Sequence, residues 1–206
     1  MKQRVMTKAA ISRGCTIALL LLSTFGLTQC VPTQHVNIAY QPNLRTAEEP
    51  NPKLPPVRVE IVDKRPSPVV GHEIGVSGER AGDIIPEGDV DDELKKAFEI
   101  ELRNEGFNIA AGGNTVVVNI SYFESQYLHP LFGTRIVASM GLDVVVRHRN
   151  GTVGYDAFIL GQNQQEAEKH LESGPNSASY ALNAAMSDAI AKTMADPAFQ
   201  AALKLK

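Results

Sequence analysis

Residues 142–159 give the clearest structural signal in this chain: Leu142-Asp-Val-Val-Val-Arg-His-Arg-Asn-Gly-Thr-Val-Gly-Tyr-Asp-Ala-Phe-Ile159. Asn150-Gly151 at its centre is a strong hairpin signal and predicts a two-residue type I′ turn between antiparallel strands. That turn would pair Arg149 with Thr152 and so bring the apolar positions of the two strands opposite one another: Val146 with Tyr155, Val144 with Ala157 and Leu142 with Ile159. Turn chemistry and hydrophobic alternation therefore agree on one register, which a slip of one residue would destroy.

More strands surround this hairpin. Its arms extend over 134–148 and 152–160, adding Ile136, Ala138, Met140 and Val153 to the apolar face. A strand over 115–127 places Val116, Val118, Ile120 and Tyr122 on one face. Near Tyr122 the apolar positions switch to Phe123 and Tyr127, as a β-bulge would produce. Alternation from Val57 to Ile61 predicts an earlier strand, and a short strand is expected near 107–110.

Two main helices complete the pattern. Asp89 can cap a helix that ends before Gly106, with apolar residues at helical spacing: Val90, Leu94, Ala97, Phe98 and Leu102. A second helix runs from about 177 to 195, and Asp196-Pro197 can start a short terminal one. Residues 64–88 contain five glycines and are expected to form a loop. The fold class is thus α+β: a mostly antiparallel sheet of four to five strands, with two main helices packed on one face.

The N-terminus carries a secretion signal. Lys2, Arg4, Lys8 and Arg13 precede an apolar run over 16–27, with no acidic residue in between. About twelve apolar residues are too few to cross ~30 Å of hydrocarbon as a helix. Residues 1–29 are therefore predicted to be a signal peptide.

The sequence Leu27-Thr-Gln-Cys30 resembles the bacterial lipobox, although Gln29 stands where that motif prefers a small residue. The resemblance implies cleavage before Cys30 and attachment of a diacylglyceryl group there, usually with a third, amide-linked chain. Two or three acyl chains hold a protein stably on a membrane, at ~0.8 kcal/mol per buried methylene. Val31 follows the cysteine instead of the Asp that retains such proteins in the inner membrane, which implies the outer membrane, facing the periplasm. The alternative is an ordinary soluble secretory signal.

Residues 31–56 hold six of the twelve prolines and lack apolar periodicity. Such a stretch is typical of a semi-extended linker. The predicted organisation is a signal peptide over 1–29, a lipidated cysteine and proline-rich tether over 30–56, and one domain over 57–206. An ordered arm packed on the domain is the alternative, with a short added strand at Val36, Ile38 and Tyr40.

Charge and side-chain chemistry narrow the function. Removing the four basic residues of the signal from the 20 in the chain leaves 16 against 23 acidic ones, a net charge of −7. That charge argues against nucleic acid, which needs a basic face. Both cysteines lie within the first thirty residues, and the five histidines lack metal-ligand spacing. His72-Glu73 starts like a zincin motif, but Val76 replaces the second histidine, so a solvent-exposed loop is expected there. We expect no enzyme activity, no metal and no cofactor.

Aromatic residues gather around the loop over 128–133. Four of the twelve aromatic residues of the chain lie between Tyr122 and Phe132. Tyr127, Leu131 and Phe132 are therefore predicted to contact a protein partner or lipid. The alternative is that these residues close the end of the hydrophobic core.

Several of these motifs together resemble the YajG-like small lipoproteins of Gram-negative bacteria. The resemblance covers roughly residues 57–203 and rests on Val59-Glu-Ile-Val-Asp63-Lys-Arg65, on the spacing of Leu94, Phe98, Leu102 and Gly106-Phe107, and on the strands around Asn150-Gly151. It implies an envelope lipoprotein and brings no catalytic residues. We expect a non-enzymatic accessory or binding module of the cell envelope. The alternative is an auxiliary lipoprotein subunit of an ABC-type lipid-transport system.

Overall fold

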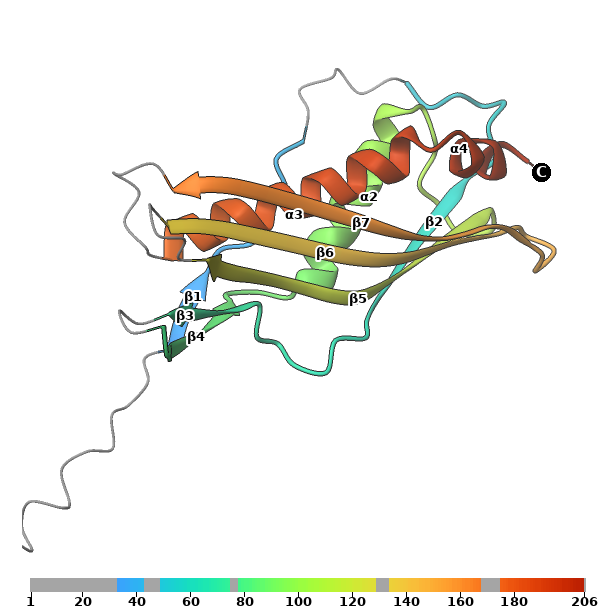
Figure 1. The fold of residues 1–206 in the computed structure, drawn as a ribbon. Helices are drawn as coiled ribbons and strands as arrows, with labels where there is room; N and C mark the ends of the chain where they lie inside the picture. Colours follow the sequence, from blue (N-terminus) through green and yellow to red (C-terminus); the bar gives the residue numbers. More distant parts are fainter. Residues whose placement is uncertain (1–32, 43–48, 75–77, 129–133, 168–174, 206) are drawn as a thin grey trace, which may run out of the picture. The chain divides into compact units, whose positions relative to one another are not determined.

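The computed structural model describes residues 33–42, 49–74, 78–128, 134–167 and 175–205. These residues form an α+β fold of one mixed sheet and three helices (Figure 1). The strands are β1 (Thr33–Val36), β2 (Val57–Asp63), β3 (Gly71–Ile74), β4 (Arg80–Pro86), β5 (Asn114–Leu128), β6 (Thr134–Arg147) and β7 (Val153–Ala167). The helices are α2 (Val90–Asn104), α3 (Pro175–Ala195) and α4 (Pro197–Lys204).

The sheet order is β1-β4-β3-β5-β6-β7, and β2 also pairs with β5. Three pairings are parallel, namely β1 with β4 and both β2 and β3 with β5. The expected sheet of four to five mostly antiparallel strands is therefore wrong in detail, because β3 and β4 were expected to be loop and a strand near β1 was only the alternative. β1 and β3 have four residues each, too few to show a period, and β4 contains Gly82 and ends at Pro86. The strand expected near 107–110 is a single bridge between Val57 and Ile109.

The hairpin register is confirmed. Val146 pairs with Tyr155, Val144 with Ala157 and Leu142 with Ile159. The turn differs from the expected type I′, because the Gly151 N–H donates to the His148 carbonyl over 2.8 Å and Gly151 has a φ of 86°. This is a longer turn with glycine in the left-handed position, and a bulge between Val146 and Arg147 restores the register. Val153 was expected in the core, but the bulge turns its side chain to the solvent, where it is 51% exposed.

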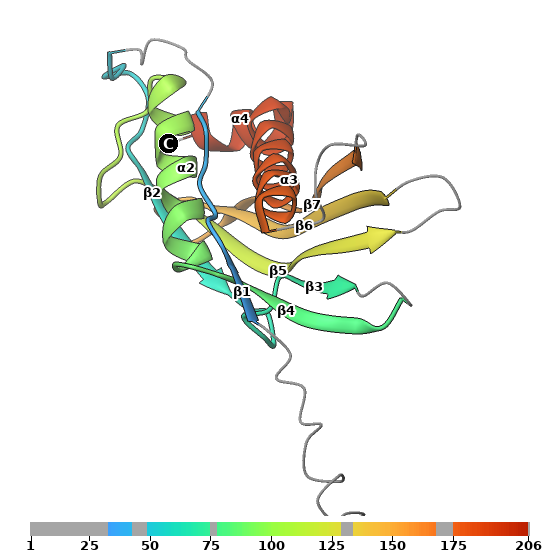
Figure 2. The same ribbon diagram turned by 90° about the vertical axis from the view of Figure 1, so that its left-hand side faces the viewer.

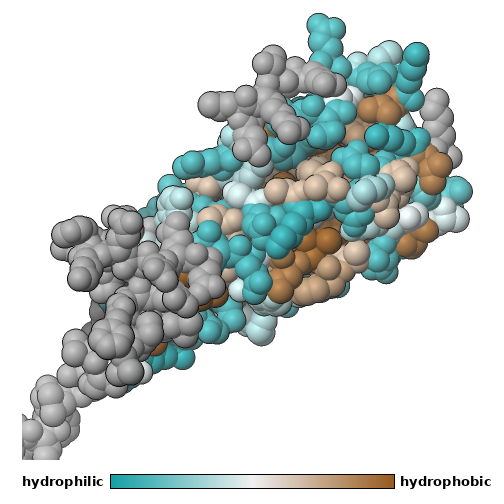
Figure 3. All heavy atoms as spheres, turned by 45° about the horizontal axis from the view of Figure 1, so that its top comes forward, coloured by the Kyte–Doolittle hydropathy of each residue, from teal (hydrophilic) through white to brown (hydrophobic). Residues whose placement is uncertain are grey.

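Both α2 and α3 lie on one side of the sheet (Figure 2). The apolar residues predicted for α2 are all buried: Val90, Leu94, Ala97, Phe98 and Leu102. From α3, the buried residues Leu182, Ala185, Met186, Ala189 and Ile190 join the same core. Gly161 of β7 allows close packing, since a Cβ there would lie 2.2 Å from the Ala185 carbonyl oxygen of α3. Figure 3 brings the top of Figure 1 forward and shows a band of apolar atoms between hydrophilic ones. No described helix is long and apolar enough to span a membrane.

The first described segment is an arm that packs on the domain. β1 extends the sheet at its edge, and Val36 is buried in the core. Leu54 is partly buried against the core and Pro55 is buried. The described parts of the expected tether, 33–42 and 49–56, are thus the ordered arm named as the alternative. The physical reason is that alternating Val36, Ile38 and Tyr40 supply an apolar face, which a proline-rich composition conceals.

Candidate functional site

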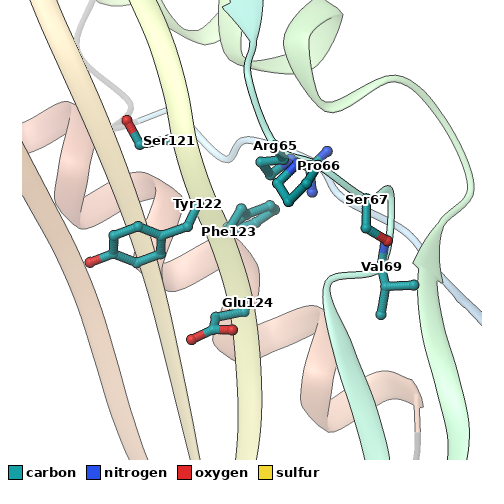
Figure 4. A pocket seen from close by; sticks show the side chains of 8 residues that line it. All are labelled: Arg65, Pro66, Ser67, Val69, Ser121, Tyr122, Phe123 and Glu124. Carbon is teal, nitrogen blue, oxygen red and sulfur yellow. The ribbon is translucent and has the colours of Figure 1, made fainter.

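The edge of β5 that faces β2 and β3 is interrupted. The Lys64 N–H donates to the Ile120 carbonyl over 3.1 Å, and the Ser125 N–H donates to the Val70 carbonyl over 2.7 Å. Between these two bonds residues 65–69 leave the sheet, and within them Pro66 and Pro68 cannot donate to a ladder. A cavity of about 190 Å³ occupies this interruption. Figure 4 shows Arg65, Pro66, Ser67 and Val69 on one side of it and residues 121–124 of β5 on the other. We call it the gap pocket.

A β-bulge shapes the β5 side of the gap pocket. Ile120 pairs with Leu142 and Tyr122 with Gly141, so Ser121 is the extra residue. The bulge confirms the parity switch expected near Tyr122, and it puts Phe123 in the core. Tyr122 itself lies on the face opposite to Ile120, so its placement with Val116, Val118 and Ile120 was wrong.

The one buried cation at this pocket among the described residues is Arg65, whose side chain is 6% exposed. Its Nε and Nη2 donate to Asp63 over 3.0 and 2.7 Å. Burial would raise the pKa of Asp63, but hydrogen bonds from Arg65 and its positive charge outweigh this and lower that pKa. Within the described part of the chain Arg65 Nη1 has no partner. The pair neutralises itself and fixes the point where the chain leaves β2.

A second cavity of about 330 Å³ adjoins the gap pocket along β5, and His72 and Arg80 contribute to its lining. His72 lies on β3 instead of in the expected loop, with Nδ1 3.1 Å from Asp83 Oδ1. Arg80 Nε donates to the same oxygen over 3.0 Å. Hydrogen bonds from Arg80, and then from His72, lower the pKa of Asp83. Ser67 Oγ, which also lines this cavity, accepts from the Val69 N–H over 3.2 Å.

The side of the sheet away from α2 and α3 carries an apolar patch, which we call the open-face patch. It is built on Tyr122 and Phe158, whose ring centres lie 6.3 Å apart, above Gly141 of the strand between them. A Cβ at position 141 would lie 2.4 Å from the Tyr122 ring, so only glycine permits this arrangement. Phe158 is 53% exposed, and Val62, which is 45% exposed, lies on the same register row with Asn119 and Asp143 between the two. Acidic residues on neighbouring positions of this face include Glu124, Asp143 and Asp156, and also Glu60, which is ion-paired with Arg58.

The predicted contact residues have different outcomes. Tyr127 is 9% exposed and belongs to the core, where burial raises the pKa of its hydroxyl. Leu131, Phe132 and the predicted lipidation site Cys30 lie outside the described residues. No group of three or more possible metal ligands occurs within the described ranges. The open-face patch was missed from sequence because its residues come from four strands, although the parity switch at Tyr122 was a signal for part of it.

Comparison with known proteins gives a family match. The family model described as "Uncharacterized lipoprotein" matches residues 42–204. A crystal structure of a protein from Xanthomonas campestris is 14% identical, covers 79% of this chain and 95% of its own, and has a TM-score of 0.48. A minor lipoprotein from Acinetobacter baumannii is 10% identical, with 73% and 95% covered and a TM-score of 0.46. No curated protein gives a match.

Proposed function

This chain belongs to the family of uncharacterised lipoproteins, and from that premise we propose that it is a non-enzymatic binding module of the cell envelope. In this proposal Cys30 carries the lipid, and the outer membrane holds the protein on its periplasmic side. The basic N-terminus, the short apolar run and Val31 after the cysteine support the proposed destination.

The open-face patch is the observation that carries the binding role. Tyr122, Phe158 and Val62 come from β5, β7 and β2 and offer apolar area on the side of the sheet that has no helix. Exposed apolar side chains that gather on one surface mark interaction sites, and aromatic residues such as the Tyr122–Phe158 pair are favoured as their anchors. Acidic neighbours would repel an acidic partner and favour a basic rim. The occupant we propose is therefore an envelope protein with an apolar centre surrounded by Lys and Arg.

The titratable groups beside β5 support a binding role in preference to catalysis. Asp63 is engaged by Arg65, and Asp83 is shared by His72 and Arg80. Groups held in such pairs define the shape and charge of a surface, whereas a catalytic acid or base needs a proton-transfer partner within reach. Leu131 and Phe132 remain proposed as additional contacts to a protein or lipid partner.

A photo-crosslinking amino acid at position 158 of the full chain, expressed in its own host, tests the docking surface. The expected result is a crosslink to one identified envelope protein with a basic rim around an apolar surface. The matched control is the same amino acid at Lys95, which is exposed on α2, on the helical side of the sheet. Crosslinks to the same proteins at both positions, or none at position 158, would overturn the assignment. A transporter subunit as the captured protein would establish the transport-system alternative.

The anchor has its own test. Labelled fatty acid should attach to the full chain in its host and should fail to attach after Cys30→Ala. Unchanged labelling of the Cys30→Ala protein, or none of the parent, would overturn the proposed lipid site.

A further inference from the structure

We propose that the domain lies directly against the lipid surface, with the end of the sheet at which β1 begins facing the membrane. The interaction surface is formed around Thr33 of β1 and the adjacent residues of β4 and β3. The partner is the headgroup layer of the membrane that holds the anchor. This inference rests on the proposed lipidation of Cys30, and it replaces a domain held away by a tether.

The length of chain between the lipid and the sheet sets this geometry. Thr33 already pairs with Asp83 in β1, three residues after Cys30. A fully extended chain covers at most ~3.6 Å per residue, so about 11 Å separates the two Cα atoms at most. The polar layer on each side of a bilayer is roughly 5–8 Å thick, from the difference between total and hydrocarbon thickness. A cysteine whose acyl chains enter the hydrocarbon therefore keeps Thr33 within reach of the headgroups.

The arm that follows Thr33 is hydrogen-bonded to the domain and therefore adds no free chain length between the lipid and the sheet. The Val36 carbonyl accepts the Glu87 N–H over 3.0 Å, and the Ala39 N–H donates to Asn183 Oδ1 over 3.0 Å. The Tyr40 N–H donates to Glu93 over 2.9 Å, and its hydroxyl donates to Glu101 over 2.6 Å. These contacts join the arm to β4, α3 and α2, and Val36 is buried among them. Lifting the domain off the membrane would break this set of contacts together.

The register identifies which residues lie beside the anchor. Thr33 is opposite Asp83, and Asp83 is opposite His72, so a row of polar side chains crosses three strands next to the lipid. Arg80, at the start of β4, is ion-paired with Asp83 and exposed. Together with Arg80, this row contains both positively and negatively charged side chains that form hydrogen bonds. Such a row suits a layer of polar headgroups, because the headgroups offer donors and acceptors and do not require a strongly basic surface.

The Asn150 turn lies at the other end of the sheet from β1, in the view of Figure 1. It follows β6, which runs 14 residues from Thr134 to Arg147. At ~3.3 Å per residue that strand is about 45 Å long. The two ends therefore differ in distance from the membrane by far more than the reach of a short-range quencher. In this orientation the open-face patch remains accessible to a protein partner beside the domain.

Tryptophan fluorescence tests the orientation, because the chain has no tryptophan of its own. Arg80→Trp and Asn150→Trp would each be made in the full chain, purified in the acylated form and placed in phosphatidylethanolamine–phosphatidylglycerol vesicles. A lipid with a nitroxide on its headgroup should quench the tryptophan of Arg80→Trp at least twofold more than that of Asn150→Trp. Gln126→Trp, exposed on β5 beside the second cavity, serves as a second probe if Arg80→Trp fails to fold. Equal quenching at both ends, or stronger quenching of Asn150→Trp, would overturn the orientation.

A variant with a longer linker tests whether the short chain after Cys30, and not lipidation alone, sets the orientation of the domain. Twelve Gly/Ser residues inserted between Val31 and Pro32 add about 20 Å of flexible reach. Flotation with the vesicles should stay unchanged while quenching of Arg80→Trp falls at least twofold. Unchanged quenching would show that the short chain between Cys30 and Thr33 does not cause the orientation. If the parent protein does not float with the vesicles, both the proposed anchor and this inference are wrong. If it floats but quenching is equal at the two ends of the sheet, only the orientation is wrong.

Discussion

Val144→Asp is the substitution that most directly tests the packing of the sheet. Val144 lies at the centre of β6, between Val118 of β5 and Ala157 of β7, and is fully buried. Val145, the next residue, is half-buried on the open face and lies opposite Asp156. One carboxylate placed at either position thus samples the two faces of the same strand.

The cost at position 144 follows from two physical effects. Removing a buried Val side chain loses about 1.5–3 kcal/mol of apolar burial. The new carboxyl must also be neutral in the core, and protonating a group of ordinary pKa 3.9 at pH 7 costs about 4 kcal/mol, at 1.36 kcal/mol per pH unit. The sum is about 6 kcal/mol against a total stability of roughly 5–15 kcal/mol. The protein should therefore be unfolded or close to it. Val145→Asp keeps its charge in water and faces one like charge, so we expect a loss of about 1–2 kcal/mol.

Urea unfolding followed by circular dichroism measures both variants, with Val144→Asn as the control that cannot ionise. The pKa of a carboxyl at position 144 is raised by folding, so its penalty is full at pH 7 and shrinks as the pH falls toward the unfolded pKa near 4. The difference between Val144→Asp and Val144→Asn should accordingly decrease from pH 7 to pH 4.5. If Val145→Asp were the less stable variant, the strand parity would be inverted and the core assignment wrong.

Three further substitutions test other contacts. Gly161→Ala should lower the free energy of unfolding by about 1–3 kcal/mol because its Cβ would meet the α3 backbone, whereas Gly88→Ala, which has open space, should be near neutral in the same urea assay. Tyr40→Phe should cost about 1–3 kcal/mol because it removes the hydrogen bond to Glu101, and Tyr180→Phe, at an exposed position, is the control that should show no loss. Asp63 has a lowered pKa, so its stabilisation is present above pH ~4 and is lost as the pH falls through the folded value. Asp63→Asn should be less stable at pH 7 and lose less on acidification, and an unchanged pH profile would contradict the Arg65 pair.

The parts of the fold predicted from sequence are those where two independent signals agree. The β6–β7 register was predicted from a turn signal and from the alternation of Val144, Val146 and Tyr155. The structure confirms the hairpin and its register, although the turn type was wrong. A bulge compensates the extra turn residue, which shows that burial of one face sets the register more strongly than turn geometry. For α2, a helical apolar stripe and Gly106 agreed in the same way, and Asp89 stands at the N-cap although its side chain makes no capping hydrogen bond.

The missed elements lack such agreement. β3 and β4 were expected to be loop because Gly71 and Gly82 suggest one, but Gly71 is required by the close approach of Ser125 in the neighbouring strand. A glycine that admits another backbone and a glycine that permits a turn are identical in sequence. The gap pocket was missed for a related reason, since its lining joins residues 65–69 to residues 121–124, and only the parallel pairing of β2 and β3 with β5 brings them together.

The misassigned arm matters most for function. Prolines predicted a tether because the alternation over Val36, Ile38 and Tyr40 is too short to outweigh the composition of residues 31–56. The bonds that hold Tyr40 come from α2, more than fifty residues away. A tether would leave the position of the domain relative to the anchor free, so that any face could meet any partner. Under the proposed lipidation of Cys30, a strand that starts three residues later couples the two, because each hydrogen bond that holds the arm would also limit the rotation of the sheet over the membrane. The fold itself then selects which surfaces a partner can approach, and the open-face patch, on the side of the sheet without helices, is among those it leaves accessible.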